Sequence, residues 1–295
     1  MAISYQSVAT QNLTSINGSP NTVTLGKPIG LAAGDLMLAI VGSNNGGDFA
    51  TPSGWTKLGE QSVGGGDEIL AAYWKIADSA DAAASSFAFA LGGTGGTNDY
   101  NGGALLRISG TAPVTSAAFY DGGADTDGGT TNNYTGGVTP LVADCLLVMG
   151  VYGRHASGAG VTVDSYSVTT SNPTWTERFE HSANDTDDYT IAVATAPRPE
   201  ITATGDFAAV FSASQTHSSG VLIAIVETTN VTVSPSVIST VLNIQAPTVE
   251  AGASVSPSVI TATVAVQAPT VTTEASDWSN KAKSSQGSTT NKQKS

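Results

Sequence analysis

Charged side chains are scarce in this sequence. Asp, Glu, Lys and Arg together make up 12 % of the 295 residues, whereas they make up about a quarter of an ordinary soluble domain. Glycine, in contrast, is abundant, with 33 residues. Low charge combined with many Gly, Thr and Val residues is typical of β-sheets joined by tight turns, and it argues against a helical bundle.

Cysteine is almost missing, because Cys145 is the only one. A disulfide within the chain is therefore excluded. Cys145 lies in DCLLVMGVY (144–152), an apolar run that predicts a buried strand. We therefore interpret Cys145 as a small core residue and not as a catalytic thiol.

Long apolar runs are also absent. No stretch reaches the length of about 18 apolar residues that indicates a membrane-spanning helix. The segment MAISYQSVATQNLTS (1–15) has neither the basic start nor the apolar centre of an export signal. The sequence therefore predicts no membrane span and no signal peptide.

Basic residues are few and unevenly placed. The chain has 11 of them against 24 acidic residues, and four stand near the C-terminus: Lys281, Lys283, Lys292 and Lys294. Residues 1–277 therefore carry a net charge of −17. Such a body repels nucleic acid, so we expect no DNA or RNA partner. We interpret the four lysines as part of a solvated tail, with contact to an acidic partner as the alternative.

The patterns of common enzymes and metal sites are missing. No GxSxG motif and no HExxH-type motif is present, and the three histidines stand far apart. These histidines are His155, His181 and His217. We therefore predict no catalytic residue, no cofactor site and no metal site, and we expect the protein not to be an enzyme.

Two acidic stretches resemble calcium-binding loops only in part. The stretch YDGGADTDGG contains Asp121, Asp125 and Asp127, and the stretch HSANDTDDY contains Asp185, Asp187 and Asp188. An EF-hand loop that began at Asp125 would need a Glu at its last position, where Gly136 stands. We therefore favour a solvated loop for the first stretch, and the second has the same two alternatives.

What the sequence does contain is a series of short, strand-like runs separated by Gly, Asn, Asp and Pro. They span residues 35–42, 68–77, 86–91, 103–109, 145–153, 189–196, 208–214 and 220–227. Runs of this length with turn signals between them predict an all-β sandwich. One stretch, 77–86, is helix-like, although it fits a loop equally well.

These runs fall into two similar halves, at about 30–110 and 140–228. WTKLGEQS (55–62) and WTERFEHS (175–182) share Trp, Thr, Glu and Ser at an offset of 120 positions. We predict that residues 1–229 form one roughly ten-stranded, jelly-roll-like sandwich with two pseudo-symmetric halves, and two tandem sandwiches are the alternative.

Two tryptophans hold equivalent positions in these halves. Trp55 opens the first Trp-Thr strand and Trp175 opens the second. Because their placement is equivalent, we favour a packing role for both over the alternative of a sugar-stacking platform.

A second, shorter duplication lies near the C-terminus. SPSVISTVLNIQAPTV (234–249) returns as SPSVITATVAVQAPTV (256–271), with ten of the sixteen positions identical. Each copy alternates apolar and polar residues between prolines, which predicts one extended strand per 22-residue unit. Two strands cannot bury an apolar face alone, so we predict that residues 230–271 form an assembly arm. Folding back onto the body is the alternative, and residues 272–295 form a polar basic tail.

The tandem units, followed by the terminal W-x-N-x-x-K-S segment (278–284), resemble the C-terminal regions of tailed-bacteriophage virion proteins. The body resembles a sandwich type of phage and bacterial surface proteins in GDLMLAIV (34–41), PSGWTKL (52–58) and AAYWKIAD (71–78). This resemblance covers most of the chain and implies an oligomeric, non-enzymatic structural protein of the virion.

The resemblance implies a displayed body that is attached through its C-terminal arm to a tail, fibre, baseplate or capsid. The expected partners are other virion proteins and copies of the chain itself, and the expected location is the virion, after synthesis in the host cytoplasm. A second hypothesis is a host-surface glycan-binding module, whose ligand-binding residues stay unknown. A glycan-cleaving enzyme is disfavoured, because no paired carboxylates stand out in the sequence.

Overall fold

The structure is a computed structural model, and the all-β prediction is confirmed in it. The residues that it describes are 3–15, 21–44, 47–63, 68–92, 100–109, 114–123, 130–140, 143–155, 160–183 and 188–226. They form fifteen strands and one short helix, and all of them lie in one compact unit. The expected repeats at 230–271 and the tail at 272–295 lie outside the described residues.

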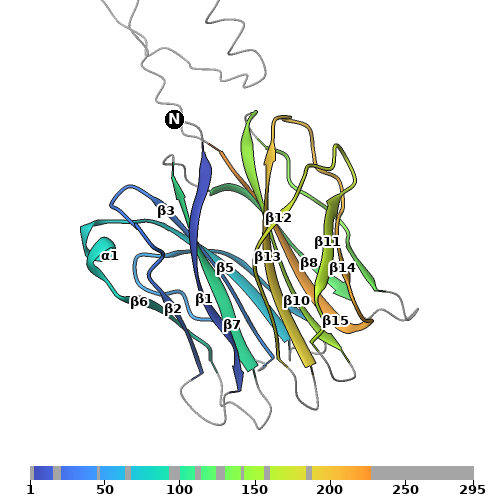
Figure 1. Ribbon diagram of the computed structural model, residues 1–295, viewed down its shortest axis with the longest axis horizontal. Helices are drawn as coiled ribbons and strands as arrows, with labels where there is room; N and C mark the ends of the chain where they lie inside the picture. The colour runs from blue at the N-terminus through green and yellow to red at the C-terminus, as the bar shows by residue number, and fades with distance from the viewer. Residues whose placement is uncertain are drawn as a thin grey trace, which may run out of the picture. The chain divides into compact units, whose positions relative to one another are not determined.

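Ten of the strands form two large antiparallel sheets. The order across the first sheet is β1 (Ser4–Ser15), β7 (Tyr100–Ser109), β3 (Leu36–Ser43), β5 (Glu68–Ile76) and β4 (Thr56–Val63). The order across the second is β8 (Val114–Gly123), β15 (Gln215–Ile225), β10 (Cys145–His155), β13 (Asp188–Arg198) and β12 (Thr176–Ala183). Figure 1 shows the first sheet in blue to green and the second in green to orange.

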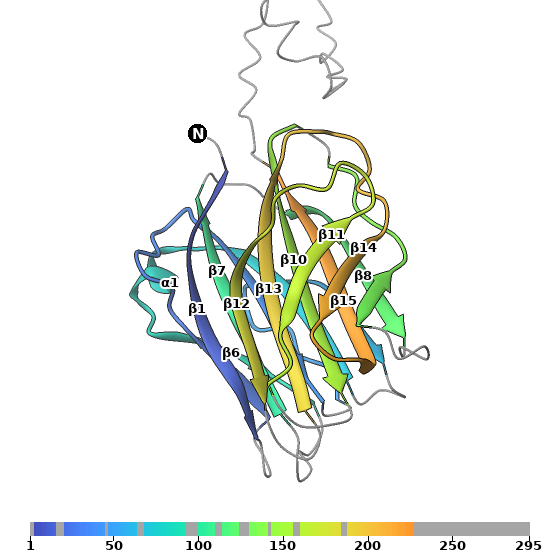
Figure 2. The ribbon, with the colours of Figure 1, turned by 45° about the vertical axis from the view of Figure 1, so that its right-hand side comes forward.

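Two small sheets cover the outer faces of the large ones. On the side of the first large sheet, β2 (Thr22–Gly26) pairs with β6 (Ser86–Ala90). On the side of the second, the order is β11 (Val163–Val168), β14 (Phe207–Phe211) and β9 (Thr131–Tyr134). Figure 2 brings this three-stranded sheet forward, with β11 and β14 in front of β10 and β15. The fold therefore has four layers of sheet.

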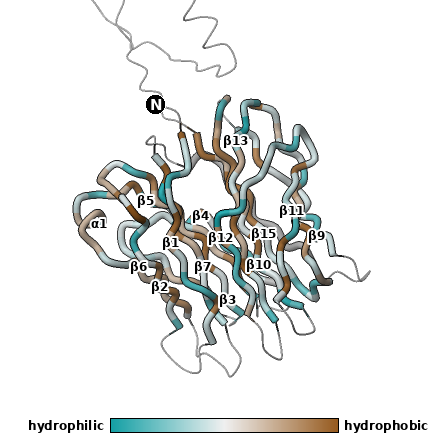
Figure 3. Tube along the Cα trace, in the orientation of Figure 1, coloured by the Kyte–Doolittle hydropathy of each residue, from teal (hydrophilic) through white to brown (hydrophobic). Residues whose placement is uncertain are grey.

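Three apolar cores fill the spaces between the layers. The middle core joins the two large sheets through residues such as Leu38, Ile40, Val148 and Ile223. The outer cores pack Phe87 and Phe89 against the first large sheet, and Phe207 and Phe211 against the second. Since each large sheet is covered on both faces, its central strands are apolar on both sides, and every residue of β3 is buried. Figure 3 shows these strands in brown.

The two large sheets have the same strand order when their strands are matched along the chain. β4 and β12 each have eight residues and begin 120 positions apart. Their pairing with the next strand is interrupted at the same place, between Lys57 and Gly59 and between Glu177 and Phe179. The offset of 120 positions, which the sequence shows in only a few identical residues, therefore also relates the hydrogen-bond registers of β4 and β12.

The expected number of about ten strands is too low. The additional strands are β1, β2, β8, β9 and β11. They lie at the edges of the large sheets or in the small outer sheets, where only part of a strand is covered. Polar residues suffice there, so sequences such as SYQSVATQNLTS (4–15) lack the apolar runs that mark a buried strand.

The helix-like stretch at 77–86 does contain a helix, α1 (Ser79–Ala83). Asp78 caps it, because its side chain accepts a hydrogen bond from Asp81 N at 2.9 Å while Asp78 N donates to the Asp81 carboxylate at 2.9 Å. The ammonium of Lys75 lies 2.7 Å from that carboxylate and ties the helix to β5. Five residues are too few for a stable isolated helix, so these contacts hold it.

Candidate functional site

A hollow of the described surface lies along the edge strand β11. It has a volume of about 310 Å³ and is lined by Val163, Asp164, Ser165, Tyr166, Pro173, Trp175 and Glu177. We call it the Trp175 groove. Its lining combines aromatic rings with carboxylates, a composition that suits a ligand with both apolar and hydrogen-bonding faces.

The aromatic part of the groove is fixed by the loop that follows β11. The indole Nε1 of Trp175 donates to the side-chain oxygen of Asn172 at 3.0 Å, and the same oxygen accepts a hydrogen bond from Val168 N. The ring centroids of Trp175 and Tyr166 are 6.2 Å apart. Tyr166 is buried in the outer core, whereas Trp175 is only partly buried. One face of the groove is therefore a positioned indole ring.

A buried arginine, Arg198, binds the backbone of the same loop. The guanidinium of Arg198, at the end of β13, donates to the carbonyl oxygens of Thr170, Ser171, Thr202 and Ala203 at 3.0 to 3.4 Å. Arg198 is 0 % exposed. The five N–H groups of a guanidinium suit several carbonyls at once, so this residue holds the loop that carries Trp175.

Glu177 lines the groove, and Glu180 lies beside it, next to Val163 of the lining. Glu177 accepts a hydrogen bond from the hydroxyl of Tyr166 at 3.2 Å, and Glu180 accepts one from Val163 N. Burial raises the pKa of Glu180, and the charges of Glu177 and Asp164 raise it further, although the Val163 hydrogen bond acts in the opposite direction. Burial followed by the charge of Glu177 also raises the pKa of Tyr166.

Three acidic side chains lie in this region: Asp164, Glu177 and Glu180. Among the residues that the structure describes, no Lys or Arg forms an ion pair with Asp164, Glu177 or Glu180. The sequence comparison of WTERFEHS with WTKLGEQS already contained the signal, because Lys57 corresponds to Glu177. That signal was missed, since nothing in the sequence shows which residues face Glu177.

The expected packing role is confirmed for Trp55 and is incomplete for Trp175. Trp55 is 9 % exposed and meets Phe87 and Phe89 edge to face, with ring centroids 5.8 and 5.1 Å away. At the position equivalent to Phe89, 120 residues further, stands Ala209. Equivalent sequence positions therefore hold one core tryptophan and one tryptophan beside a groove.

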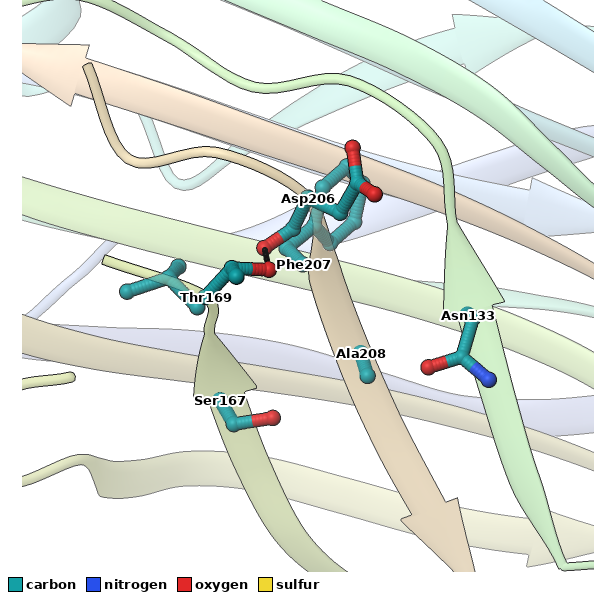
Figure 4. Close-up of a pocket in the computed structure, with 7 residues that line it drawn as sticks. Asn133, Ser167, Thr169, Asp206, Phe207 and Ala208 are labelled. Carbon is teal, nitrogen blue, oxygen red and sulfur yellow. Dashed lines mark hydrogen bonds between the residues drawn. The ribbon is translucent and has the colours of Figure 1, made fainter.

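A second, smaller hollow of about 100 Å³ lies over the three-stranded sheet, lined by Asn133, Ser167, Val168, Thr169, Asp206, Phe207 and Ala208. Figure 4 shows Asn133 and Ser167 on either side of Ala208. The Thr169 hydroxyl donates to the Asp206 carbonyl oxygen at 3.0 Å, and the Asp206 carboxylate accepts a hydrogen bond from Gly136 N at 2.7 Å. Asp206 thus has a structural role at the end of β14.

One histidine has an acid and a hydroxyl beside it, which the sequence did not predict. His155 Nδ1 lies 3.8 Å from an oxygen of Asp188, and Nε2 lies 3.1 Å from the hydroxyl of Thr190. The two strands β10 and β13 bring these residues together, since His155 pairs directly with Asp188. Pairing over 33 positions leaves no local signal in the sequence.

This group does not have the geometry of a nucleophilic triad. The Thr190 hydroxyl donates to the carbonyl oxygen of Val161 at 2.6 Å, so its proton is already directed away from the imidazole. His155, Asp188 and Thr190 are at most 1 % exposed. Burial lowers the pKa of His155 to about 4, although the charge of Asp188 acts in the opposite direction. The group is therefore a buried structural network.

The other candidate residues are dispersed. His181 Nδ1 accepts a hydrogen bond from Leu13 N at 3.2 Å, where β12 meets β1, and His217 lies in β15. Within the described ranges, no three His, Cys, Asp or Glu side chains form a group that could hold a metal ion. Cys145 is buried as expected, and burial raises the pKa of its thiol to about 11.

The acidic stretches have mixed outcomes. Asp188 is 0 % exposed, so a solvated-loop interpretation is wrong for that residue. Asp121 belongs to β8, and the remaining members, Asp125, Asp127, Asp185 and Asp187, lie outside the described residues.

Comparisons with known proteins give no relative. No family model, no curated protein and no solved structure matches the chain. Within the described part of the chain, no helix is long and apolar enough to cross a membrane.

Proposed function

We propose that this chain is a non-enzymatic structural protein of a phage virion, with a displayed β body and an attachment arm at 230–271. The observation that supports the proposal is the closure of the body. Residues between Leu13 and Val226 build all three cores, and the central strands of both large sheets are covered on both faces. The apolar alternation of 230–271 supports the proposed contacts with partners.

The body is a jelly-roll-like sandwich with two pseudo-symmetric halves, produced by an internal duplication. Support comes from the common strand order of the two large sheets and from the matching interruptions in β4 and β12. Each half uses one large sheet to cover the other half. Such a body is well suited to display, because its described residues form three apolar cores.

Deletion of residues 230–295 tests the attachment role. We expect the full chain to form homo-oligomers or to bind other virion proteins, and the truncated chain to stay a folded monomer. Light scattering after size exclusion measures the mass, and circular dichroism checks that the truncated body keeps its β content. Assembly of the truncated chain to the same mass as the full chain would contradict the proposed arm.

A second candidate function is binding of a host-surface glycan by the body. The Trp175 groove favours it, because an indole ring there lies beside hydrogen-bond acceptors. A glycan array probed with the full chain tests this function, with Trp175→Ala as the matched variant. Binding that the variant abolishes supports the function, and an empty array at millimolar glycan contradicts it.

A further inference from the structure

The Trp175 groove has a counterpart in the first half of the body. Phe49 pairs with Leu91 in an isolated bridge, and Val163 pairs with Phe211 at the start of β11. Leu91 and Phe211 are 120 positions apart, the same offset that relates β4 to β12. The backbone of Val163 therefore takes the place that Phe49 takes in the first half.

The glutamates that accept hydrogen bonds from these two residues are also at equivalent positions. Glu60 accepts a hydrogen bond from Phe49 N at 2.9 Å, and Glu180, 120 positions later, accepts one from Val163 N. Both are the same distance in sequence from the strand interruption that β4 and β12 share. The two halves thus provide two versions of one arrangement.

In the first half, a lysine ammonium completes the arrangement. Nζ of Lys57 lies 2.9 Å from the Glu60 carboxylate and donates to the carbonyl oxygen of Phe49 at 2.9 Å. It also lies 5.9 Å from the centre of the Tyr73 ring, within the range of a cation–π contact. The charge of the partly buried Glu60 is therefore compensated inside the chain.

In the second half, the position of Lys57 is taken by Glu177, which reverses the charge. Glu180 then has a second carboxylate beside it in place of an ammonium. Burial raises the pKa of Glu180, and the charge of Glu177 adds to that effect. The side chain beside this pair also differs, because Trp175 lines an open groove where Trp55 is buried. The second half therefore repeats the glutamate acceptor of the first half, and among the described residues no Lys or Arg forms an ion pair with it.

We propose that the Trp175 groove binds an amino sugar, whose protonated amine takes the place that Lys57 Nζ takes in the first half. The amine lies between Glu177 and Glu180, and the pyranose ring packs on the indole of Trp175. Exposed Asp164 and Ser165 accept hydrogen bonds from the sugar hydroxyls. This inference rests on the glycan-binding candidate function and names the class of glycan.

Charge complementarity favours an amine over a neutral or acidic sugar. A hydrogen bond between an ammonium and a carboxylate is about twice as strong as one between neutral groups. The negative charge of residues 1–277 adds a field that attracts cations and repels sialic acids or phosphorylated sugars. Binding is therefore expected to weaken as salt rises.

The experiment measures binding of three probes to the full chain by titration calorimetry or by NMR. The probes are a β-1,4-linked tetramer of glucosamine, the same tetramer fully N-acetylated, and butylammonium. The glucosamine tetramer is expected to bind about tenfold or more tightly than either of the others, since one lost charged hydrogen bond costs at least that factor.

The test variant is Glu177→Lys, which copies the first half. It supplies an internal ammonium to Glu180, so it is expected to fold normally and to weaken glucosamine binding by a factor of about 10 to 100. Glu200→Lys makes the same charge change outside the groove lining and is expected to bind as the unaltered chain does. Thermal unfolding of both variants separates lost binding from lost folding.

Each contrary result has a distinct meaning. Equal binding of the two tetramers would overturn the amino-sugar inference and leave the glycan-binding function standing. Equal binding of butylammonium would overturn the role of the saccharide ring. Unchanged binding in Glu177→Lys would overturn the site, and no binding of any probe together with an empty glycan array would overturn both the inference and the function.

Discussion

Gly150 of β10 faces Ile40 of β3 so closely that a Cβ on the glycine would lie 2.8 Å from Cγ2 of the isoleucine. The neighbouring contact has the same form with the roles exchanged, since a Cβ on Gly42 would lie 2.7 Å from the ring of Tyr152. The central strands β3 and β10 of the two large sheets thus interlock, because a large side chain of each strand packs against a glycine of the other.

This relationship makes a prediction for Gly150→Ala. The added methyl group overpacks the middle core and is expected to lower the free energy of unfolding by about 1–3 kcal/mol. Combined with Ile40→Ala, the loss should be smaller than the sum of the two single losses, because the second change removes the clashing atoms. Urea unfolding of the unaltered chain, the two single variants and the double variant measures this coupling. Strictly additive losses would show that Gly150 and Ile40 are not in contact.

The two equivalent tryptophans are expected to differ in their contribution to stability. Trp55→Ala removes a buried ring that packs on Phe87 and Phe89 and should cost about 3–5 kcal/mol. Trp175 is only partly buried, so Trp175→Ala should cost less than half as much. Denaturant midpoints of the two variants, compared at equal slope, give the difference. Equal losses would mean that Trp175 is an ordinary core residue.

The buried imidazole of His155 predicts a dependence of stability on pH. Its pKa is about 4 in the folded chain against 6.5 for a free histidine, so the unfolded chain binds the proton more readily. Stability from this group is complete above pH 6.5 and falls as the pH drops toward 4, by up to about 3 kcal/mol. The signature is the difference between the chain and His155→Asn in urea unfolding at several pH values. A difference that does not change with pH would place His155 in contact with solvent.

Arg198 is expected to be a positioning residue for the groove. Arg198→Lys keeps the charge but loses the planar donors that reach Thr170 and Ser171. Loss of the hydrogen bonds that the buried guanidinium donates should lower the free energy of unfolding by about 2–4 kcal/mol. Hydrogen exchange should also rise in the loop at 169–175, which a general loss of stability alone would not single out. Unchanged exchange in that loop would contradict the anchoring role.

Local patterns in the sequence were enough for the fold class and for most of the buried strands. The run GDLMLAIV is apolar on both faces because β3 lies between two cores. A strand that is buried on both faces consists almost entirely of apolar residues, so it can be recognised from the sequence. The likeness of β4 and β12 was also visible, since WTKLGEQS and WTERFEHS keep Trp, Thr, Glu and Ser at a constant offset. Polar strands such as β9 were not predicted, because only one of their faces is covered and such a strand needs few apolar residues.

The candidate site depended on contacts between distant parts of the chain. The sequence shows that Lys57 is replaced by Glu177 at the equivalent position. The consequence of this replacement depends on the backbone of Phe49 and Val163, which the fold brings next to Lys57 and Glu180. The sequence by itself determined that the chain is all-β and that two similar Trp-Thr strands lie 120 positions apart. Only the tertiary structure decided which tryptophan is buried and which carboxylates form no ion pair within the described part of the chain. The physical reason is that burial and electrostatic surroundings depend on neighbours that strand pairing brings together.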